Sequence, residues 1–160
     1  MKKLLLVLAL GLLFSPAADA YQCVKSQALD KSDQCTAYVR VAADETTLVS
    51  IGHVLVHDLS EGTVNGITFQ TELSDASADD TLIAGIAQGS VTSGSLAQVV
   101  VRGKTKVRLA TGNVVSSGDA LYVSATEGNV GHTGDGSPPI GFALEASSGG
   151  ENIDAYITIV

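Results

Sequence analysis

Two histidines four residues apart are the most suggestive pair of metal-ligating side chains in this chain. His53 and His57 form an H-x-x-x-H pattern, which on a helix places two imidazoles on one face to bind zinc. The surrounding valines and leucines instead predict a strand, in which residues four apart lie about 13 Å from each other. We therefore expect structural or exposed roles for both histidines rather than a shared metal ion.

An acidic segment offers the second candidate for ion binding. Glu72, Asp75, Asp79 and Asp80 carry carboxylates, and calcium takes about six to eight oxygen ligands. No D-x-D-x-D-G loop organises these carboxylates. The sequence therefore predicts no cofactor, with calcium as an open alternative.

Catalytic arrangements are missing from the sequence. No serine stands in a G-x-S-x-G turn, which holds the nucleophile of many hydrolases. Aromatic residues make up 4% of the chain, so stacking platforms for sugars or bases are few. Tyr122, Phe142 and Tyr156 are explained equally well as core residues. We predict that the protein is not an enzyme.

The basic residues gather in one short segment of an acidic chain, whose formal net charge is −8. Arg102, Lys104, Lys106 and Arg108 alternate, which places all four on one face of a strand. They form either a solvated strand face or an electrostatic contact with an acidic patch on a neighbouring copy. The acidic surface as a whole argues against nucleic acid as a partner.

Residues 1–20 have the three parts of an export signal. Two lysines precede an apolar run at 4–14, and Ala18-Asp19-Ala20 is typical of a cleavage site. The run is shorter than the roughly 20 residues that span a membrane. We therefore expect a cleaved signal, no membrane anchor, and a protein that is secreted, extracellular or at the cell surface, with the periplasm as an alternative.

Export also suggests a role for the two cysteines. Cys23 and Cys35 would meet an oxidising compartment, and a disulfide between them would contribute about 3 kcal/mol by closing a short polar loop. A metal or redox pair would need a C-x-x-C spacing or further ligands, so the sequence favours the disulfide.

The mature chain predicts an all-β fold, a small barrel or sandwich. Its residues favour strands and its glycines mark turns at short intervals, including one at Gly103 and a surface loop at 71–81. The expected strands are 36–41, 47–56, 67–70, 82–87, 96–102, 107–109, 120–124, 140–146 and 153–160.

The chain also shows an internal repeat. Gly85-Ile86-Ala87 recurs as Gly141-Phe142-Ala143, 56 residues later, and 51–56 has a weaker echo at 117–122. Repetition of this kind indicates one β unit used twice. We expect two pseudo-repeated copies at about 48–102 and 114–160, forming a domain at 48–160 that follows an N-terminal disulfide loop at 21–47.

The N-terminal segment is also a candidate assembly arm. Its strand carries Thr36, Tyr38 and Arg40 and could pair with the sheet edge of a neighbouring copy by β-augmentation. Packing of the strand against its own domain is the other alternative, and the sequence leaves both open.

The second copy carries the motifs of a known module. Residues 118–123 read GDALYV, residues 139–146 read PIGFALEA, and an apolar strand follows at 153–160. This order resembles the small β domain of phage capsid decoration and head-fibre proteins, over residues 48–160. The first copy departs from it, since His53 stands where the pattern has aspartate. The resemblance implies a non-enzymatic unit that binds a protein lattice or copies of itself.

Export would set this chain apart from a capsid protein assembled in the cytoplasm. We therefore expect a secreted structural protein that self-assembles through sheet edges into an extracellular filament or surface layer, with copies of itself as partners. One alternative is a monomeric secreted or periplasmic module that binds a protein or glycan. The other is a phage capsid decoration protein.

Overall fold

The computed structural model of the chain describes residues 24–25, 34–58, 70–75, 82–133 and 138–159. Every regular element in these ranges is a strand, which confirms the predicted all-β class. In the same ranges, no helix is long and apolar enough to cross a membrane. The strands are β1 (Val24–Lys25), β2 (Cys35–Arg40), β3 (Val54–Asp58), β4 (Gln70–Leu73), β5 (Ile83–Ala87), β6 (Leu96–Arg108), β7 (Ala120–Val123), β8 (Val130–Gly131), β9 (Gly141–Ala143) and β10 (Asn152–Thr158).

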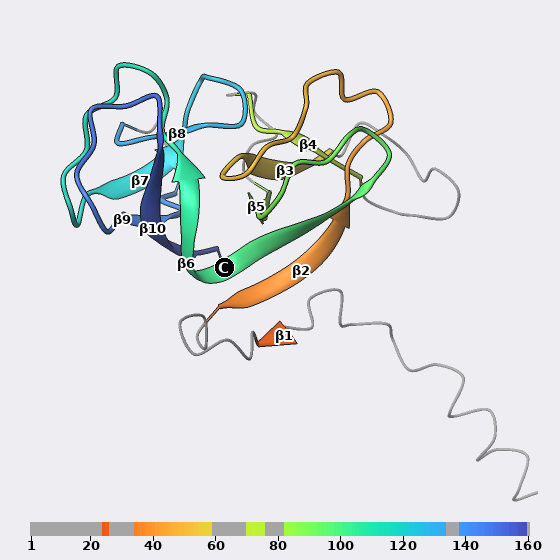
Figure 1. Cartoon of the computed structure of the whole chain (residues 1–160), viewed down its shortest axis with the longest axis horizontal. Helices are drawn as coiled ribbons and strands as arrows, with labels where there is room; N and C mark the ends of the chain where they lie inside the picture. The colour runs from red at the N-terminus through yellow and green to blue at the C-terminus, as the bar shows by residue number, and fades with distance from the viewer. Residues whose placement is uncertain (1–23, 26–33, 59–69, 76–81, 134–137, 160) are drawn as a thin grey trace, which may run out of the picture.

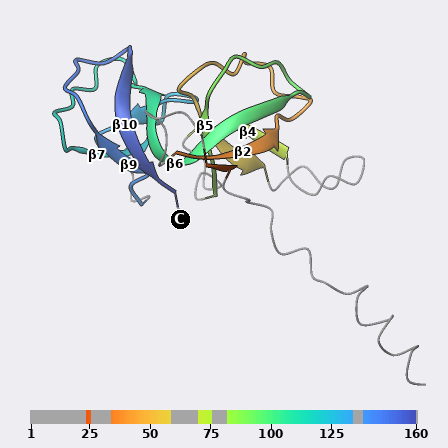
Figure 2. The same cartoon turned by 60° about the horizontal axis from the view of Figure 1, so that its bottom comes forward.

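The strands form one curled sheet, in which the long strand β6 links two lobes (Figure 1). The order is β4-β3-β5-β6-β10-β9-β7-β8, with β2 paired to the first half of β6 and β1 paired to β2. We call β2–β5 with residues 96–102 lobe 1, and residues 103–108 with β7–β10 lobe 2. The turned view in Figure 2 shows the same two groups of strands side by side.

Two local predictions from the sequence are wrong. Gly103 does not end a strand, because β6 runs through it and stays in register with β10 at Ile157. Its φ of 107° suits glycine and lies where β6 passes from one lobe to the other. The loop predicted at 71–81 begins too early, because β4 extends to Leu73 and pairs with β3.

Each lobe curls until its first and last strands meet. In lobe 1, Val41 and Thr71 form a parallel bridge; in lobe 2, Leu109 and Val130 do the same. The backbone nitrogen that follows each bridge donates across it, Ala42 to Thr71 at 2.8 Å and Ala110 to Val130 at 2.8 Å. Each lobe is thus a small curled unit with its own interior.

The two lobes pair their strands in matching registers. One cross-strand row in each lobe shows this for three neighbouring strands, and we call these rows the lobe 1 row and the lobe 2 row. The lobe 1 row is Val54, Ile86 and Val100, and the lobe 2 row is Ala120, Phe142 and Tyr156. The predicted repeat is consistent with these registers and stays a prediction.

Two apolar clusters fill the interior. One lies wholly in lobe 1 and includes Val41, Leu55 and Val99. The other fills lobe 2, with Leu109, Leu121 and Ile153 among its members, and it also takes in Val54 and Ile86 from lobe 1. These two side chains therefore join the lobes, and fully burying one of this size contributes about 1.5–3 kcal/mol.

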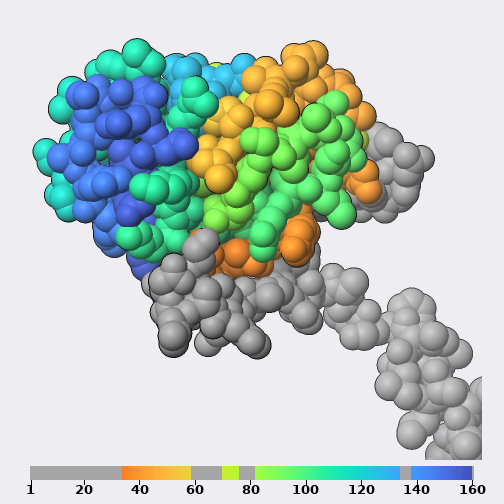
Figure 3. Space-filling view, viewed as in Figure 1, coloured from red at the N-terminus to blue at the C-terminus, as the bar shows by residue number. Residues whose placement is uncertain are grey.

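Main-chain hydrogen bonds add to this contact between the lobes. The Val54 nitrogen donates to the Gly128 carbonyl at 2.8 Å, and the Gly128 nitrogen donates to the Ser74 carbonyl at 2.7 Å. The Arg108 nitrogen donates to the Gly52 carbonyl at 2.9 Å. Figure 3 shows the result, with the blue and teal lobe 2 directly against the yellow and green parts of lobe 1.

Candidate docking surface

The basic residues of β6 lie on one exposed face of that strand. Arg102, Lys104, Lys106 and Arg108 are exposed and alternate with buried residues, because successive side chains of a strand point to opposite faces. Their role in assembly stays a prediction. The geometry puts them on one face of β6 as it passes from lobe 1 into lobe 2.

Acidic residues of the same chain neutralise part of this basic face. Lys104 and Lys106 each place Nζ 2.7 Å from a carboxylate oxygen of Asp154 on β10, and Lys106 lies 3.6 Å from Glu145. Hydrogen bonds from Lys104 and Lys106 lower the pKa of Asp154, and the bond to Asp154 raises the pKa of Lys106. The face therefore attracts an acidic partner less strongly than the sequence suggests.

The three candidate residues of β2 have different surroundings. Thr36 is buried and pairs with Val100 of β6. Arg40 is half-buried, and its Nη1 donates to the Gly94 carbonyl at 2.6 Å. Tyr38 points outward, and its side chain is 67% exposed. All of β2 pairs with β6 of the same chain, which is the second of the two alternatives that the sequence left open.

Tyr38 belongs to an exposed patch on lobe 1. Its partner across the sheet is Gln98, and the next pair on that face is Arg40 with Leu96. Leu96 is 59% exposed, so two large apolar side chains lie in water beside an arginine and an amide. We call these four residues the lobe 1 face.

Lobe 2 exposes an aromatic patch of its own. Phe142 and Tyr156 stack with their ring centroids 5.5 Å apart and their planes 16° from parallel, and Phe142 is 40% exposed. Lys104 pairs with Tyr156 on one side of the stack, and Ala120 pairs with Phe142 on the other. We call these four residues the lobe 2 face. The predicted repeat aligns Phe142 with Ile86, but this alignment alone does not reveal that Phe142 is exposed.

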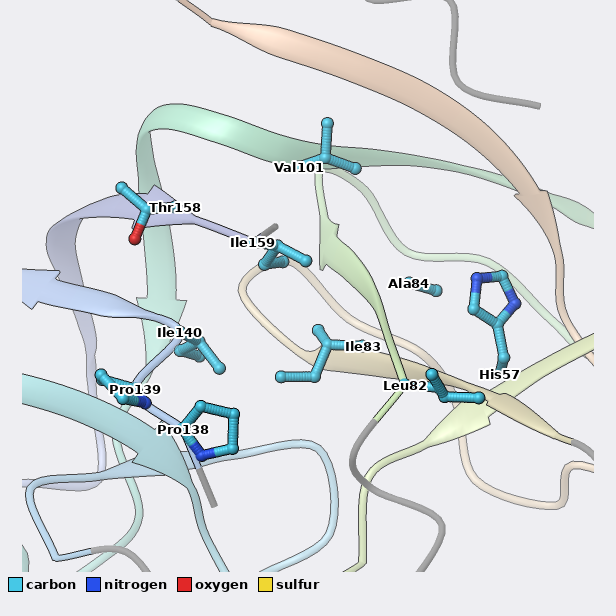
Figure 4. A pocket seen from close by; sticks show the side chains of 10 residues that line it. All are labelled: His57, Leu82, Ile83, Ala84, Val101, Pro138, Pro139, Ile140, Thr158 and Ile159. Atoms are coloured by element: carbon cyan, nitrogen blue, oxygen red, sulfur yellow. The ribbon is translucent and has the colours of Figure 1, made fainter. Parts of the chain in front are cut away.

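An apolar cavity of about 580 Å³ lies between the lobes (Figure 4). Leu82, Ile83 and Ala84 of lobe 1 line one side, and Pro138, Pro139 and Ile140 of lobe 2 line the other. His57, Val101, Thr158 and Ile159 complete the lining. In Figure 4 the side chain of Ile159 projects into the space between the two sides.

The two histidines lie at β3: His57 is within the strand and His53 immediately precedes it. Within the described residues, no group of three metal-ligating side chains lies together. Burial, and then the charge of Arg108, lower the pKa of His53, and burial lowers the pKa of His57. His53 Nδ1 accepts a hydrogen bond from the Ser50 nitrogen at 3.3 Å.

His53 therefore does in lobe 1 what an aspartate does in lobe 2. The carboxylate of Asp119 accepts the corresponding bond, from the Ser116 nitrogen at 2.8 Å. Histidine at position 53, where the pattern has aspartate, therefore preserves the hydrogen bond within this turn. Both side chains are structural here.

The acidic segment holds one carboxylate with a raised pKa. Burial, followed by the charges of Asp58 and Asp75, raises the pKa of Glu72 to about 7. The backbone nitrogen of Leu73 donates to Glu45 at 3.0 Å. Two of the four calcium candidates, Asp79 and Asp80, lie outside the described residues, so the calcium alternative is not tested.

Two other predictions also fall outside the described residues. The export signal at 1–20 lies there, and so does Cys23, the partner of Cys35 in the predicted disulfide. Cys35 itself is buried at the start of β2. The disulfide therefore stays a prediction.

Comparison with known proteins identifies the family. The model described as "Phage cement protein" matches residues 33–159, which include every strand from β2 to β10. The chain belongs to the phage cement protein family. The resemblance to phage decoration and head-fibre modules is thereby confirmed, and the chain is a phage structural protein.

A solved structure shares the fold. The N base of the head fibre gp8.5 of bacteriophage phi29 superimposes with a TM-score of 0.52 at 20% sequence identity. The match covers 78% of this chain and 94% of that one. Identity this low shows the common fold alone. A search of curated proteins found no significant match.

The family corrects one prediction made from the sequence. We expected a secreted protein, and this localisation is wrong, because phage cement and head-fibre proteins are components of the phage particle, assembled within the host cell. The extracellular filament inferred from export loses its basis as well. The alternative of a phage capsid decoration protein fits the family better.

Proposed function

We propose that this chain is a decoration protein that binds the outer surface of a phage capsid. The observation that carries the proposal is the family match, which extends over nearly all of the described fold. The two-lobed β body adds support, since it offers exposed sheet faces for contact and no cluster of metal-ligating side chains in the described ranges.

The lobe 1 face is the part of the surface best suited to the capsid. Of the large apolar side chains in the described ranges, Tyr38 is the most exposed. Tyrosine and arginine are enriched among the residues that dominate binding energy at interfaces. Tyr38, Arg40 and Leu96 would supply an apolar centre with a polar rim, as protein interfaces commonly have.

The basic residues of β6 play a secondary part in this proposal. Arg102 and Arg108 lie at the two ends of the basic series, beyond the lysines that pair with Asp154. Exposed charges at the edge of an interface contribute more to the association rate and to orientation than to affinity. We expect the basic residues of β6 to steer the protein onto an acidic shell.

Binding of purified protein to capsids that lack it tests this function. The full chain should sediment with the capsids, and Tyr38→Ala should weaken binding at least tenfold because it removes the centre of the contact. Val114→Ala is the matched control, since Val114 is another exposed apolar side chain outside both faces. Failure of the wild-type chain to sediment with capsids would contradict the function. Equal binding by Tyr38→Ala would remove the lobe 1 face from it.

We also propose that the body is one β unit used twice, with boundaries that include β2. Residues 35–40 pair with the first half of β6 as residues 103–108 pair with β10, and the partners correspond: Val39 with Ala97, and Val107 with Ile153. The turn bonds support the same correspondence, because Gly52 donates to Ala87 at 2.9 Å and Gly118 donates to Ala143 at 2.8 Å.

A further inference from the structure

His53 lies at the contact between the two lobes, and it is 7% exposed. A Cβ atom added to Gly128 of lobe 2 would lie 3.0 Å from the His53 ring and 3.0 Å from the Leu73 side chain. Both backbone groups of Gly128 form hydrogen bonds across this contact, to Val54 and Ser74. The imidazole therefore packs directly against lobe 2.

A backbone hydrogen bond requires the neutral form of this imidazole. The Ser50 nitrogen donates to His53 Nδ1 at 3.3 Å, and the His53 nitrogen donates back to the Ser50 carbonyl at 3.1 Å. A ring nitrogen accepts a hydrogen bond only while it carries no proton, because both nitrogens of a protonated imidazole are donors. Protonation of Nδ1 would thus place two N–H donors face to face in this turn.

The surroundings of His53 oppose a positive charge. Burial, and then the charge of Arg108, lower the pKa of His53, while the charge of Glu45 acts in the opposite direction. The carboxylate of Glu45 already accepts hydrogen bonds from the backbone nitrogens of Thr47 and Leu73, at 2.8 and 3.0 Å. A protonated His53 would therefore be a buried cation near an arginine, and burial of such a charge is unfavourable.

Other titratable groups lie on the elements packed around this histidine. They are His57 and Asp58 on β3, Glu72 on β4, Lys106 on β6, and Glu127 before Gly128. Lys106 forms an ion pair with Asp154, and Glu127 is exposed to water. Because burial raises the pKa of Glu72 to about 7, this side chain loses its negative charge as the solution becomes acidic.

The equivalent turn in lobe 2 shows what the histidine changes. There the Ser116 nitrogen donates to the Asp119 carboxylate at 2.8 Å, and the Asp119 nitrogen donates to the Ser116 carbonyl at 3.1 Å. An aspartate accepts in its charged form, whereas a histidine accepts only in its uncharged form. Histidine is also the side chain that ordinarily titrates between about pH 5 and 8. Mild acid therefore acts on the turn of lobe 1.

We propose that His53 is a pH-sensitive switch, which holds the two lobes together at neutral pH and loosens their contact when it is protonated. The backbone hydrogen bonds that Gly52 and Gly128 make across the contact would open with the turn. The apolar side chains of Val54 and Ile86, which pack in the cluster of lobe 2, would then meet solvent. This property goes beyond capsid binding and does not depend on it.

The direction of the effect follows from the proton affinities of the closed and open forms. Because the pKa of His53 is lowered from 6.5 in the folded chain, the open form binds the proton more tightly. The contact keeps its full stability above pH 6.5 and loses it as the pH falls from 6.5 toward the pKa of the closed form. Glu72 acts in the opposite sense, because its raised pKa favours the folded form as the pH falls below 7. Glu72 therefore does not account for an opening caused by acid.

Hydrogen exchange followed by NMR on the full chain tests the proposal, with protection factors compared at about pH 7.5 and about pH 5. Protection of the Val54, Arg108 and Gly128 amides should fall on acidification, because these amides donate across the contact. Once His53 is protonated, the fall should be about tenfold for each unit by which its measured pKa lies below 6.5. The Ala143 amide, bonded to the Asp119 carbonyl in lobe 2, should keep its protection.

His53→Asp gives lobe 1 the residue that lobe 2 has in its turn, and it should abolish the fall in protection. His132→Asp makes the same change at an exposed histidine and should retain the fall. Should His53→Asp fail to fold, an NMR titration of the wild type remains decisive, because the amide shifts at the contact should share the midpoint of the His53 ring. A midpoint for His53 at or above 6.5, protection that acid leaves unchanged, or a fall that persists in folded His53→Asp would overturn the proposal.

Discussion

Lobe 1 and lobe 2 use the same strand pairings to present different surfaces. In lobe 1 the row is buried, with Val54 and Ile86 packed against lobe 2, and the exposed apolar side chains Tyr38 and Leu96 lie where β2 pairs with β6. In lobe 2 the outer row is aromatic and open, and ion pairs cover the neighbouring strand. Backbone register alone therefore does not determine which face meets a partner.

The position of Asp154 makes the same point. It lies opposite Lys106, and the equivalent pair in lobe 1 is Tyr38 with Gln98. An ion-paired position in one lobe is thus an exposed tyrosine in the other. Equivalent strand positions in the two lobes therefore present chemically different side chains to solvent.

The largest expected effect comes from truncating the two rows at equivalent positions. Ile86→Ala should lower the free energy of unfolding by about 2–5 kcal/mol, because it leaves a cavity between the lobes. Phe142→Ala should cost about 1 kcal/mol at low protein concentration, where it removes a stacked but exposed ring. Urea unfolding measures both, and equal losses would mean that the rows do not differ in burial.

A glycine pair sharpens the comparison at the turns. Gly52 and Gly118 have φ values of 85° and 94°, so alanine at either position carries a strain of about 1–2 kcal/mol. An added methyl group at Gly52 would also crowd the Arg108 nitrogen of lobe 2, whereas one at Gly118 would meet open space. We therefore expect Gly52→Ala to lose more stability than Gly118→Ala. Thermal unfolding of the two variants checks this, and a greater loss in Gly118→Ala would contradict the contact described between the lobes.

The smallest effect concerns pH and the acidic end of lobe 1. Because the pKa of Glu72 rises to about 7 in the folded chain from 4.5, the folded state binds the proton more tightly than the unfolded state. The carboxylate is therefore unfavourable above pH 7, and this penalty fades as the pH falls toward 4.5. Its counterpart in lobe 2 is Gly131, which carries no charge.

Glu72→Gln should accordingly raise the melting temperature at pH 8, and the gain should shrink at pH 5. Glu127→Gln removes an exposed carboxylate from lobe 2 and serves as the control for net charge. A gain that is the same at both pH values would show that Glu72 is not destabilised by its surroundings.

The sequence predicts the strands better than it predicts their packing. Alternation correctly places Arg102 to Arg108 on one face, since strand periodicity is a local property. It does not reveal that Asp154 neutralises two of the lysines, because that contact joins residues about 50 positions apart. Glycine favours turns locally, so Gly103 predicts one. In the fold, β6 instead continues through Gly103, because both halves of the strand pair with neighbouring strands.

The candidate surfaces depend on tertiary packing even more strongly. Nothing local distinguishes Ile86, which is buried by the second lobe, from Phe142, which is not. Leu96 likewise looks like the start of a buried strand until the sheet places it outside. The family motifs indicate the kind of protein correctly, whereas the N-terminal segment suggests a secreted location that the family overturns.

Electron cryomicroscopy of phage particles that contain this chain tests the central claim most directly. We predict two-lobed densities on the outside of the capsid, with Tyr38 and Leu96 turned toward the shell. Particles that carry no such density, or density in which lobe 1 points away from the shell, would contradict the account.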